Sequence, residues 1–333
     1  MVDKHKEDRI TKALILCSYN DYGSEAEFHS IEQANNERER GHKFINHLIL
    51  RDKTREIDNV KFNFLLDGAP IMVYSLLNVF RSRVKDAIIV GNKDSEQIFN
   101  YFMEYYRPHK YGKNFKFVNE GKNLSLSNTI KKGRDNLNLD SNELTLLLPA
   151  DIPFFSDLYP IIKDGTNNEY DGILNLNSKE KIGKYFPRNY HLDVKKEDKI
   201  YRIKEPNLFL FNLSKLDLNI IDMAYGGRKT YSSFKDKGKK LIEKGRDFFI
   251  KERFLKKGKI IKTFCALRGS YGSIVSRVLQ NRDPLIKLNS LEKLVNMAFD
   301  MRIKVKVDNN DPSTLEDVDS LEDWCYLNSM ILN

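Results

Sequence analysis

The chain has 333 residues, of which 41% are hydrophobic and 31% charged, and its formal net charge is +9. This composition is typical of a globular protein and excludes a chain that is mainly disordered. No apolar run approaches the roughly 18 residues of a membrane-spanning helix, and the first residues lack the apolar core of a signal peptide.

The positive charge suits an anionic partner, such as nucleotide phosphates, a phosphorylated substrate, nucleic acid or an anionic membrane. The three cysteines, Cys17, Cys265 and Cys325, form no C-x-x-C pair. They predict free thiols in a reducing, cytoplasmic setting rather than a zinc site or disulfides.

Strands and helices alternate through the first half of the chain. Apolar runs predict strands at 12–18, 87–91, 115–118 and 144–148. Helical spacing predicts three helices. The first begins at Pro70 and has Ile71, Tyr74, Leu77 and Phe80 at helical spacing. The second spans 94–106, with Ile98, Phe102 and Tyr105 on one face, and the third spans 125–137. The polar stretch 19–60 interrupts the alternation and is interpreted as an insertion. Such alternation indicates an α/β, Rossmann-like, mostly parallel sheet that is flanked by helices on both faces.

The second half is less regular and indicates a mixed α+β region. We expect strands at 171–176, 207–211 and 302–307, and helices at 270–281, at 289–300 and from Ser320. The stretch 226–262 holds fourteen Lys or Arg against four Asp or Glu. We favour a helix packed on the core with a solvated lysine face here; the alternative is peripheral contact with an anionic membrane.

Three parts follow from this pattern. They are a nucleotide-binding half at 1–165 with the insertion 19–60, an acceptor-side region at 166–301, and a strand and helix at 302–333 that return to the core.

Polar residues follow the predicted strands directly. Ser18, Glu120 and Asp151 each lie at or just after a strand end, and ligands of parallel sheets bind at the carboxyl ends of the strands. A buried carboxylate at Asp151 is costly unless it is paired or binds a hard cation such as Mg²⁺. The alternative is that Asp151 caps a short helix at 152–158.

Two further segments carry weaker signals. Residues 120–127 form a strand–turn–helix junction whose backbone N–H groups can receive a phosphate or a base carbonyl, or simply a turn with a serine cap. The acidic pair Asp317 and Asp319 follows the last strand and could be only a solvated turn.

The order of four motifs along the chain resembles that of the nucleotidyltransferases of the molybdenum-cofactor guanylyltransferase type. The motifs are Lys61 with Gly68-Ala69-Pro70, Gly121 with Ser127, Ala150-Asp151-Ile152-Pro153, and 317–324. Those sugar-nucleotide-synthetase-like enzymes have a GT-A-type fold. The resemblance implies that Asp151 and Asp319 hold Mg²⁺, with Asp319 ahead of Asp317. It also implies that Lys61 neutralises phosphate charge and that Glu120, Gly121 and Ser127 seat the base and ribose.

The first loop departs from the family pattern. The family has a glycine-rich loop with an arginine after its first strand, whereas this chain has Ser18, Gly23 and Ser24 with one glycine and no arginine in place. Those three residues can still offer hydroxyl and N–H donors to the triphosphate. Lys43, Arg51 or Lys53 of the insertion could replace the arginine.

The implied reaction is transfer of a nucleotidyl group from an NTP to a phosphorylated small-molecule acceptor, with release of pyrophosphate. Similar relatives place the acceptor against Arg188, Lys204 and Asn207; the alternative is that these residues are exposed polar groups on a hairpin. A GT-A-type glycosyltransferase and a catalytically impaired nucleotide-binding regulatory protein remain as rival functions. No nucleic-acid-binding module is recognised, and no nucleic-acid partner is expected.

Overall fold

The computed structural model describes residues 10–17, 65–66, 69–121, 125–152, 170–179, 192–204, 208–219, 221 and 285–307. The chain divides into two compact units. Unit 1 comprises 1–169, 206–214 and 310–333, and unit 2 comprises 170–205 and 215–309. The three-part division expected from the sequence stays a prediction.

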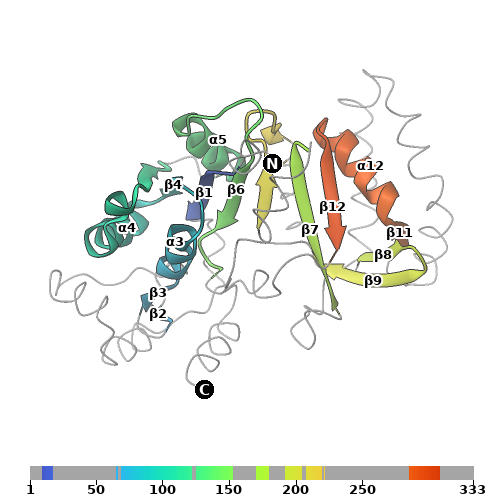
Figure 1. Ribbon diagram of the computed structural model, residues 1–333, viewed down its shortest axis with the longest axis horizontal. Helices are drawn as coiled ribbons and strands as arrows, with labels where there is room; N and C mark the ends of the chain where they lie inside the picture. The colour runs from blue at the N-terminus through green and yellow to red at the C-terminus, as the bar shows by residue number, and fades with distance from the viewer. Residues whose placement is uncertain are drawn as a thin grey trace, which may run out of the picture. The chain divides into compact units, whose positions relative to one another are not determined.

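Unit 1 is built on a mostly parallel sheet with the strand order β10-β6-β1-β4-β5 (Figure 1). Its strands are β1 (Lys12–Cys17), β4 (Asp86–Gly91), β5 (Asn114–Asn119), β6 (Thr145–Pro149) and β10 (Phe209–Phe211). Only β10 runs antiparallel to its neighbour among these pairs. Two short strands, β2 (Leu65–Leu66) and β3 (Ala69–Pro70), pair separately. The α/β, mostly parallel sheet predicted from the sequence is confirmed.

Helices cover both faces of this sheet. They are α3 (Ile71–Arg81), α4 (Lys93–Tyr106) and α5 (Leu126–Asn136), with a 3₁₀ turn at Pro108–Tyr111. Right-handed crossovers place α3 and α4 on one face, because the chain moves from β1 to β4 to β5 in one direction. The return from β5 to β6 places α5 on the other face, as Figure 1 shows.

The centre of the sheet is strand β1, whose six residues are all buried. The sequence of a strand that is covered on both faces is a continuous apolar run, and for this reason β1 could be predicted from the sequence. Its lysine is accommodated at the strand start, where Lys12 pairs with Glu143 and donates to the carbonyl of Asn138. Thr11 donates a further hydrogen bond of 2.7 Å to Glu143.

The predicted faces of two helices need correction. In α3 Ile71 is buried as expected, but the buried face continues through Met72, Ser75, Leu76 and Val79, whereas Tyr74, Leu77 and Phe80 are half-buried. Phe80 points instead toward a cluster of aromatic rings, with centroids 6.3 Å from Phe102 and 6.4 Å from Phe115.

In α4 the prediction for Ile98 and Phe102 holds, because both are buried. Tyr105 is 47% exposed, and its neighbour Tyr106 lies against Phe102 at 4.8 Å between ring centroids. Tyr105 and Tyr106 are neighbours, and a long aromatic side chain at either position can reach the buried face of the helix. Helical spacing alone therefore did not show which of the two tyrosines packs inward.

The described residues of unit 2 include a mixed set of strands and the helix α12. Its elements are β7 (Gly172–Ser178), β8 (Leu192–Lys196), β9 (Lys199–Lys204), β11 (Leu285–Lys287), α12 (Leu288–Phe299) and β12 (Ile303–Val307). Strand β12 runs parallel to β7, β8 and β9 form an antiparallel hairpin, and β11 runs parallel to β8. Leu176, Val194, Ile203, Ile286 and Val305 form the core of this unit, and leucines of α12 pack against it.

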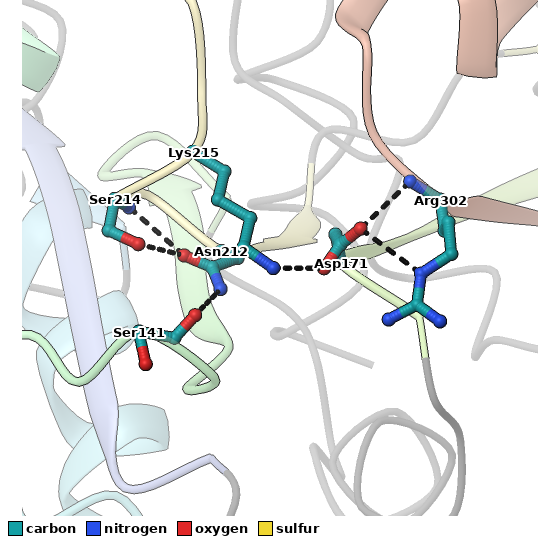
Figure 2. Close-up of polar contacts among 6 residues, drawn as sticks. All are labelled: Ser141, Asp171, Asn212, Ser214, Lys215 and Arg302. Atoms are coloured by element: carbon teal, nitrogen blue, oxygen red, sulfur yellow. Dashed lines mark hydrogen bonds and ion pairs between the residues drawn. The ribbon is translucent and has the colours of Figure 1, made fainter.

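Asp171, just before β7, joins three parts of unit 2 that are distant in the chain (Figure 2). Its carboxylate accepts 2.7 Å from Lys215 Nζ and 3.0 Å from the backbone N–H of Arg302, whose Nε lies at 3.5 Å. Burial acts to raise the pKa of Asp171, but the hydrogen bonds from Lys215 and Arg302 outweigh it, so the pKa lies below its ordinary value. The carboxylate is therefore ionised over the neutral range.

Unit 1 has a similar polar anchor after β10. Asn212 donates 2.6 Å to the carbonyl of Ser141, in the segment that leads into β6, and its Oδ1 accepts from both the backbone and the hydroxyl of Ser214 (Figure 2). This amide fixes the end of β10 to the chain before its neighbouring strand.

Several predicted segments lie outside the described residues. They are the insertion 19–60, the basic stretch 226–262, the helix at 270–281 and the helix from Ser320. Within the described part of the chain, no helix is long and apolar enough to cross a bilayer.

Candidate active site

The candidate site of unit 1 lies at the carboxyl ends of its parallel strands. The register pairs Cys17 with Gly91 at the ends of β1 and β4. The next backbone bonds run from the N–H of Glu120 to the carbonyl of Gly91 (2.8 Å) and from Ala150 to Leu16 (2.9 Å). Glu120 and Asp151 therefore follow their strands directly, as the sequence predicted.

Both carboxylates are buried, Glu120 with 2% and Asp151 with 4% of its surface exposed. They act on the same thiol: burial raises the pKa of Cys17 most, and the negative charges of Glu120 and Asp151 raise it further. Cys17 is therefore a protonated thiol and not a nucleophile at neutral pH. Two carboxylates around one buried point create a field that favours a cation.

Ser75 of α3 holds the backbone on both sides of Asp151. Its buried hydroxyl lies 3.1 Å from the carbonyl oxygen of Ala150 and 2.9 Å from that of Ile152. Helix α3 thus fixes the turn that presents Asp151 to the strand ends.

Gly91 allows the end of β1 to approach the start of α4. A Cβ at this position would lie 2.8 Å from the Cβ of Cys17 and 3.0 Å from that of Ser95. The first turn of α4 is fixed in turn by the side chain of Asn92, which accepts 2.9 Å from the backbone N–H of Ser95. A larger residue at position 91 would push these elements apart.

The turn after β5 is held by Lys132 of α5. Its ammonium donates to the carbonyls of Glu120 and Asn119, the latter at 3.3 Å. Gly121 has a φ of +73°, which favours glycine, and a Cβ there would meet Lys132 Nζ at 2.9 Å. Asn119 Oδ1 accepts from the N–H of Gly121 at 2.8 Å. This turn is therefore built around Gly121.

Helix α5 begins with the serine cap that the sequence offered as the simpler interpretation. Ser125 accepts from the backbone N–H of Asn128 at 3.2 Å, and its hydroxyl lies 3.0 Å from that of Ser127. Ser127 is buried within this cap. Its contact with a base or ribose stays a prediction.

Four of the predicted site residues are described at the edge of this sheet: Glu120, Gly121, Ser127 and Asp151. Lys204 is described as part of β9 in unit 2, where its backbone is opposite Asn177. The others lie outside the described residues, namely Ser18, Gly23, Lys61, Arg188, Asn207, Asp317 and Asp319, as does the helix that Asp151 was alternatively expected to cap.

Sequence reasoning missed Ser75, Gly91 and Lys132. One signal was present for Ser75, since a serine on the buried side of an otherwise apolar helix needs a hydrogen-bond partner. Gly91 ends a strand of larger residues, and a glycine in that place often marks a close backbone approach. Lys132 gave no such signal, because its partners lie more than ten residues away in the chain.

The donor set suits a hard cation. Asp151 supplies a buried carboxylate at the strand ends, and Mg²⁺ in phosphate-transfer sites usually takes one or two carboxylates and completes its shell with water and phosphate oxygens. Within the described residues, no group of three or more His, Cys, Asp or Glu is placed to hold a metal by itself. The residues present therefore fit a metal that is held jointly by protein and substrate.

Comparisons with known proteins give distant likenesses only. No protein-family model and no curated protein sequence matches the chain. Among solved structures, a hypothetical transferase from Thermus thermophilus is similar over 94% of this chain and 98% of its own, with 13% identity and a TM-score of 0.49.

Two further solved structures are similar over nearly the full length of both chains. A 4-diphosphocytidyl-2C-methyl-D-erythritol synthase from Anaerococcus prevotii covers 97% of this chain and 98% of its own, at 12% identity and a TM-score of 0.44. An inositol-1-phosphate CTP transferase from T. maritima covers 98% and 97%, at 11% identity and a TM-score of 0.45. Likeness at this level does not assign a function, which has to be inferred from the residues of the site.

Proposed function

We propose that the chain is a Mg²⁺-dependent nucleotidyltransferase that transfers NMP from an NTP to a phosphorylated small-molecule acceptor and releases pyrophosphate. The observation that carries this proposal is the pair of buried carboxylates, Glu120 and Asp151, at the carboxyl ends of β5 and β6, two parallel strands of one sheet with β1 and β4 between them. The motif order that resembles the guanylyltransferase-type family gives it direction.

The acceptor phosphate is already a good nucleophile, so the reaction needs positioning and charge neutralisation more than a general base. Bound Mg²⁺ would supply Lewis-acid stabilisation of phosphate oxygens. Asp151 would hold the cation, and Ser75 would keep that carboxylate in place. The turn at Glu120 and Gly121, fixed by Lys132, would present backbone and side-chain groups to the nucleoside.

The remaining roles rest on residues outside the described part of the chain, except for Lys204 of β9. Lys61 would neutralise charge on the phosphates, Asp319 would give a second metal contact, and Ser18 and Gly23 would donate to the triphosphate. Arg188, Lys204 and Asn207 would bind the acceptor. These assignments follow from the sequence resemblance.

The test is a pyrophosphate-release assay. The protein is incubated with Mg²⁺, each NTP in turn, and a panel of phosphorylated sugars and alcohols. We expect release with one NTP and acceptor pair, and a loss on the order of 10²-fold or more in Asp151→Asn, because a metal-binding charge is removed. Asp86→Asn is the matched control, since Asp86 starts β4 and its carboxylate accepts from Asn114 at 3.2 Å, at the other end of the strand.

The other outcomes contradict the proposal in different ways. Full activity in Asp151→Asn contradicts the assignment of the metal to Asp151. Release of a nucleoside diphosphate from a nucleotide-sugar, without pyrophosphate from NTPs, identifies a glycosyltransferase. Tight NTP binding with no turnover for any acceptor identifies a regulatory protein.

A further inference from the structure

Unit 2 contains a groove of about 690 Å³ that has no part in the proposed nucleotidyl transfer. Three segments form it: the turn between β8 and β9, the start of α12, and the end of β12. The lining residues are Lys195, Lys196, Glu197, Lys287, Leu288, Asn289, Glu292, Lys304, Val305, Lys306 and Val307. A concave space of this size is in the range that small-molecule ligands fill.

The charge of the groove is strongly positive. Five of its lining residues are lysines and two are glutamates. One glutamate is engaged already, because Glu292 lies 3.1 Å from Lys304 Nζ and accepts 3.1 Å from the backbone N–H of Val305. Within the described residues, neither Lys195 nor Lys196 pairs with a carboxylate. The groove therefore carries a net positive charge, which attracts an anion.

The first turn of α12 adds a field of the same sign. Lys287 precedes the helix without a side-chain cap, and the first turn holds no acidic residue. Leu288 and Asn289 of this turn line the groove. The positive end of a helix dipole therefore reinforces the lysines, although the lysine cluster is the principal observation.

The floor of the groove rests on the core of unit 2. Val305 belongs to that buried core, and Leu288 and Val307 pack against it. The lysines stand on the strands β8, β11 and β12, which bring five of them to one groove. Like charges gathered around one groove repel, and an anion that binds among them relieves the repulsion.

We propose that this groove binds a small molecule that carries phosphate groups. Lysine ammonium groups and helix N-termini are the usual partners of phosphate oxygens. The concave shape favours a free phosphate compound over the flat surface of an anionic membrane. The proposal is independent of the function assigned to the carboxylates of unit 1.

The test uses inorganic pyrophosphate as the probe and isothermal titration calorimetry of the full chain in EDTA, which removes metal-dependent binding at Asp151. We expect saturable binding that weakens at least tenfold in the variant Lys195→Gln/Lys196→Gln. The matched control is Lys110→Gln/Lys293→Gln, which removes the same charge from two exposed residues outside the groove. The control should bind within twofold of the unaltered chain.

The remaining arms separate the possible sources of phosphate. Asp151→Asn should keep its metal-free affinity for pyrophosphate, which distinguishes this site from the proposed active site. Equal weakening in both double variants, or no pyrophosphate binding by the unaltered chain, overturns the proposal. So does a groove-dependent association with vesicles of equimolar phosphatidylcholine and phosphatidylserine in the absence of binding to free pyrophosphate.

Discussion

At the scale of single residues, a buried serine fixes the backbone around Asp151. Ser75 lies within the buried side of α3 and reaches the carbonyls of Ala150 and Ile152. A hydroxyl has one proton, so it donates to one carbonyl at a time and alternates between two close acceptors. Because those carbonyls flank Asp151, the hydroxyl sets the direction of the carboxylate.

We therefore predict that Ser75→Ala impairs metal use as well as folding. The buried carbonyls lose their donor, which should lower the free energy of unfolding by about 1–3 kcal/mol. If Asp151 holds Mg²⁺, as proposed, its less fixed carboxylate should also raise the Mg²⁺ concentration for half-maximal activity severalfold. Urea unfolding measures the first effect, and a Mg²⁺ titration of pyrophosphate release measures the second.

Ser82→Ala separates the two effects. Ser82 ends the same helix, where its hydroxyl donates 2.7 Å to the carbonyl of Val79 and accepts 3.2 Å from the N–H of Val84. Its loss should reduce stability without altering the Mg²⁺ requirement. An unchanged Mg²⁺ requirement in Ser75→Ala, with Asp151→Asn inactive, would show that Ser75 is purely structural.

At the scale of elements, the packing of α5 on β1 depends on one small residue. A Cβ at Gly133 would lie 2.1 Å from Cδ1 and 2.8 Å from Cδ2 of Leu14, and Leu14 is fully buried in the central strand. Helix and strand therefore meet where only a hydrogen atom fits. Such contacts transmit changes in the helix directly to the sheet.

We predict that Gly133→Ala destabilises the protein although alanine is the better helix former. In an exposed helix this change stabilises by about 1 kcal/mol. Here overpacking against Leu14 should reverse the sign and lower the free energy of unfolding by about 1–3 kcal/mol. Urea denaturation of the single variant checks the direction.

A double-mutant cycle with Leu14→Ala tests the cause. Leu14→Ala alone should cost about 2–5 kcal/mol because it opens a cavity. Gly133→Ala should then be harmless or favourable in that background, since the clashing methyl groups are gone. Additive losses in the double variant would show that the cost of Gly133→Ala arises elsewhere.

The elements of unit 1 were predictable because their patterns are local. Strand β1 is a continuous apolar run, and each following strand and helix carries its own period. The faces of α3 and α4 were less predictable, because several faces of an apolar helix fit the same spacing. Tyr105 is exposed for this reason, since aromatic partners from other elements decide which face is buried.

The hairpin of β8 and β9 left no such pattern. Its turn is Glu197-Asp198, with Glu197 at a φ of +55°, whereas hairpins are usually marked by Asn-Gly or Asp-Gly. Charged residues make up at least half of each strand. The pairing is decided by Val194 and Ile203, which pack into the core of unit 2, and that packing is visible only in the folded chain.

The candidate site was predictable to the extent that strand order places residues at one edge. Glu120 and Asp151 follow apolar strands, and the carboxyl ends of parallel strands meet by topology. Ser75 and Lys132 act on the backbone of segments that are 75 and 12 residues away in sequence, so no local pattern reports them. The placement of Glu120 and Asp151 at the strand ends was therefore predictable from the sequence, whereas the contacts of Ser75 and Lys132 were not.

At the scale of the whole molecule, the chain forms two units, and each is tied together by polar contacts between distant segments. In unit 1, Lys12 and Glu143 join the start of β1 to the chain before β6, at the end of the sheet opposite the candidate site. In unit 2, Asp171 joins the starts of β7 and β12 to Lys215. Acid should weaken the second anchor only at low pH, because the pKa of the Asp171 carboxyl lies below its ordinary value.

The sign of this pH dependence follows from the direction of the pKa shift. Burial raises the pKa of Asp171, but the hydrogen bonds from Lys215 and Arg302 lower it by a larger amount. The pKa in the folded chain therefore lies below that in the unfolded chain. The stabilisation is then fully present above the unfolded pKa of about 4 and is lost as the pH falls through the folded value.

We predict that Asp171→Asn lowers the free energy of unfolding at pH 7 by about 1–3 kcal/mol, because a buried acceptor of charged hydrogen bonds is weakened. The difference from the unaltered chain should shrink as the pH falls below about 4. Urea unfolding between pH 7 and pH 3 measures both quantities.

Asp135→Asn is the control. The pKa of Asp135 is also lowered, first by its hydrogen bond from Lys131, but this pair is exposed. An exposed pair contributes about 0.3–0.5 kcal/mol, so Asp135→Asn should hardly change the curve. A pH-independent gap for Asp171→Asn would mean that its amide fails for steric reasons and not through the lost charge.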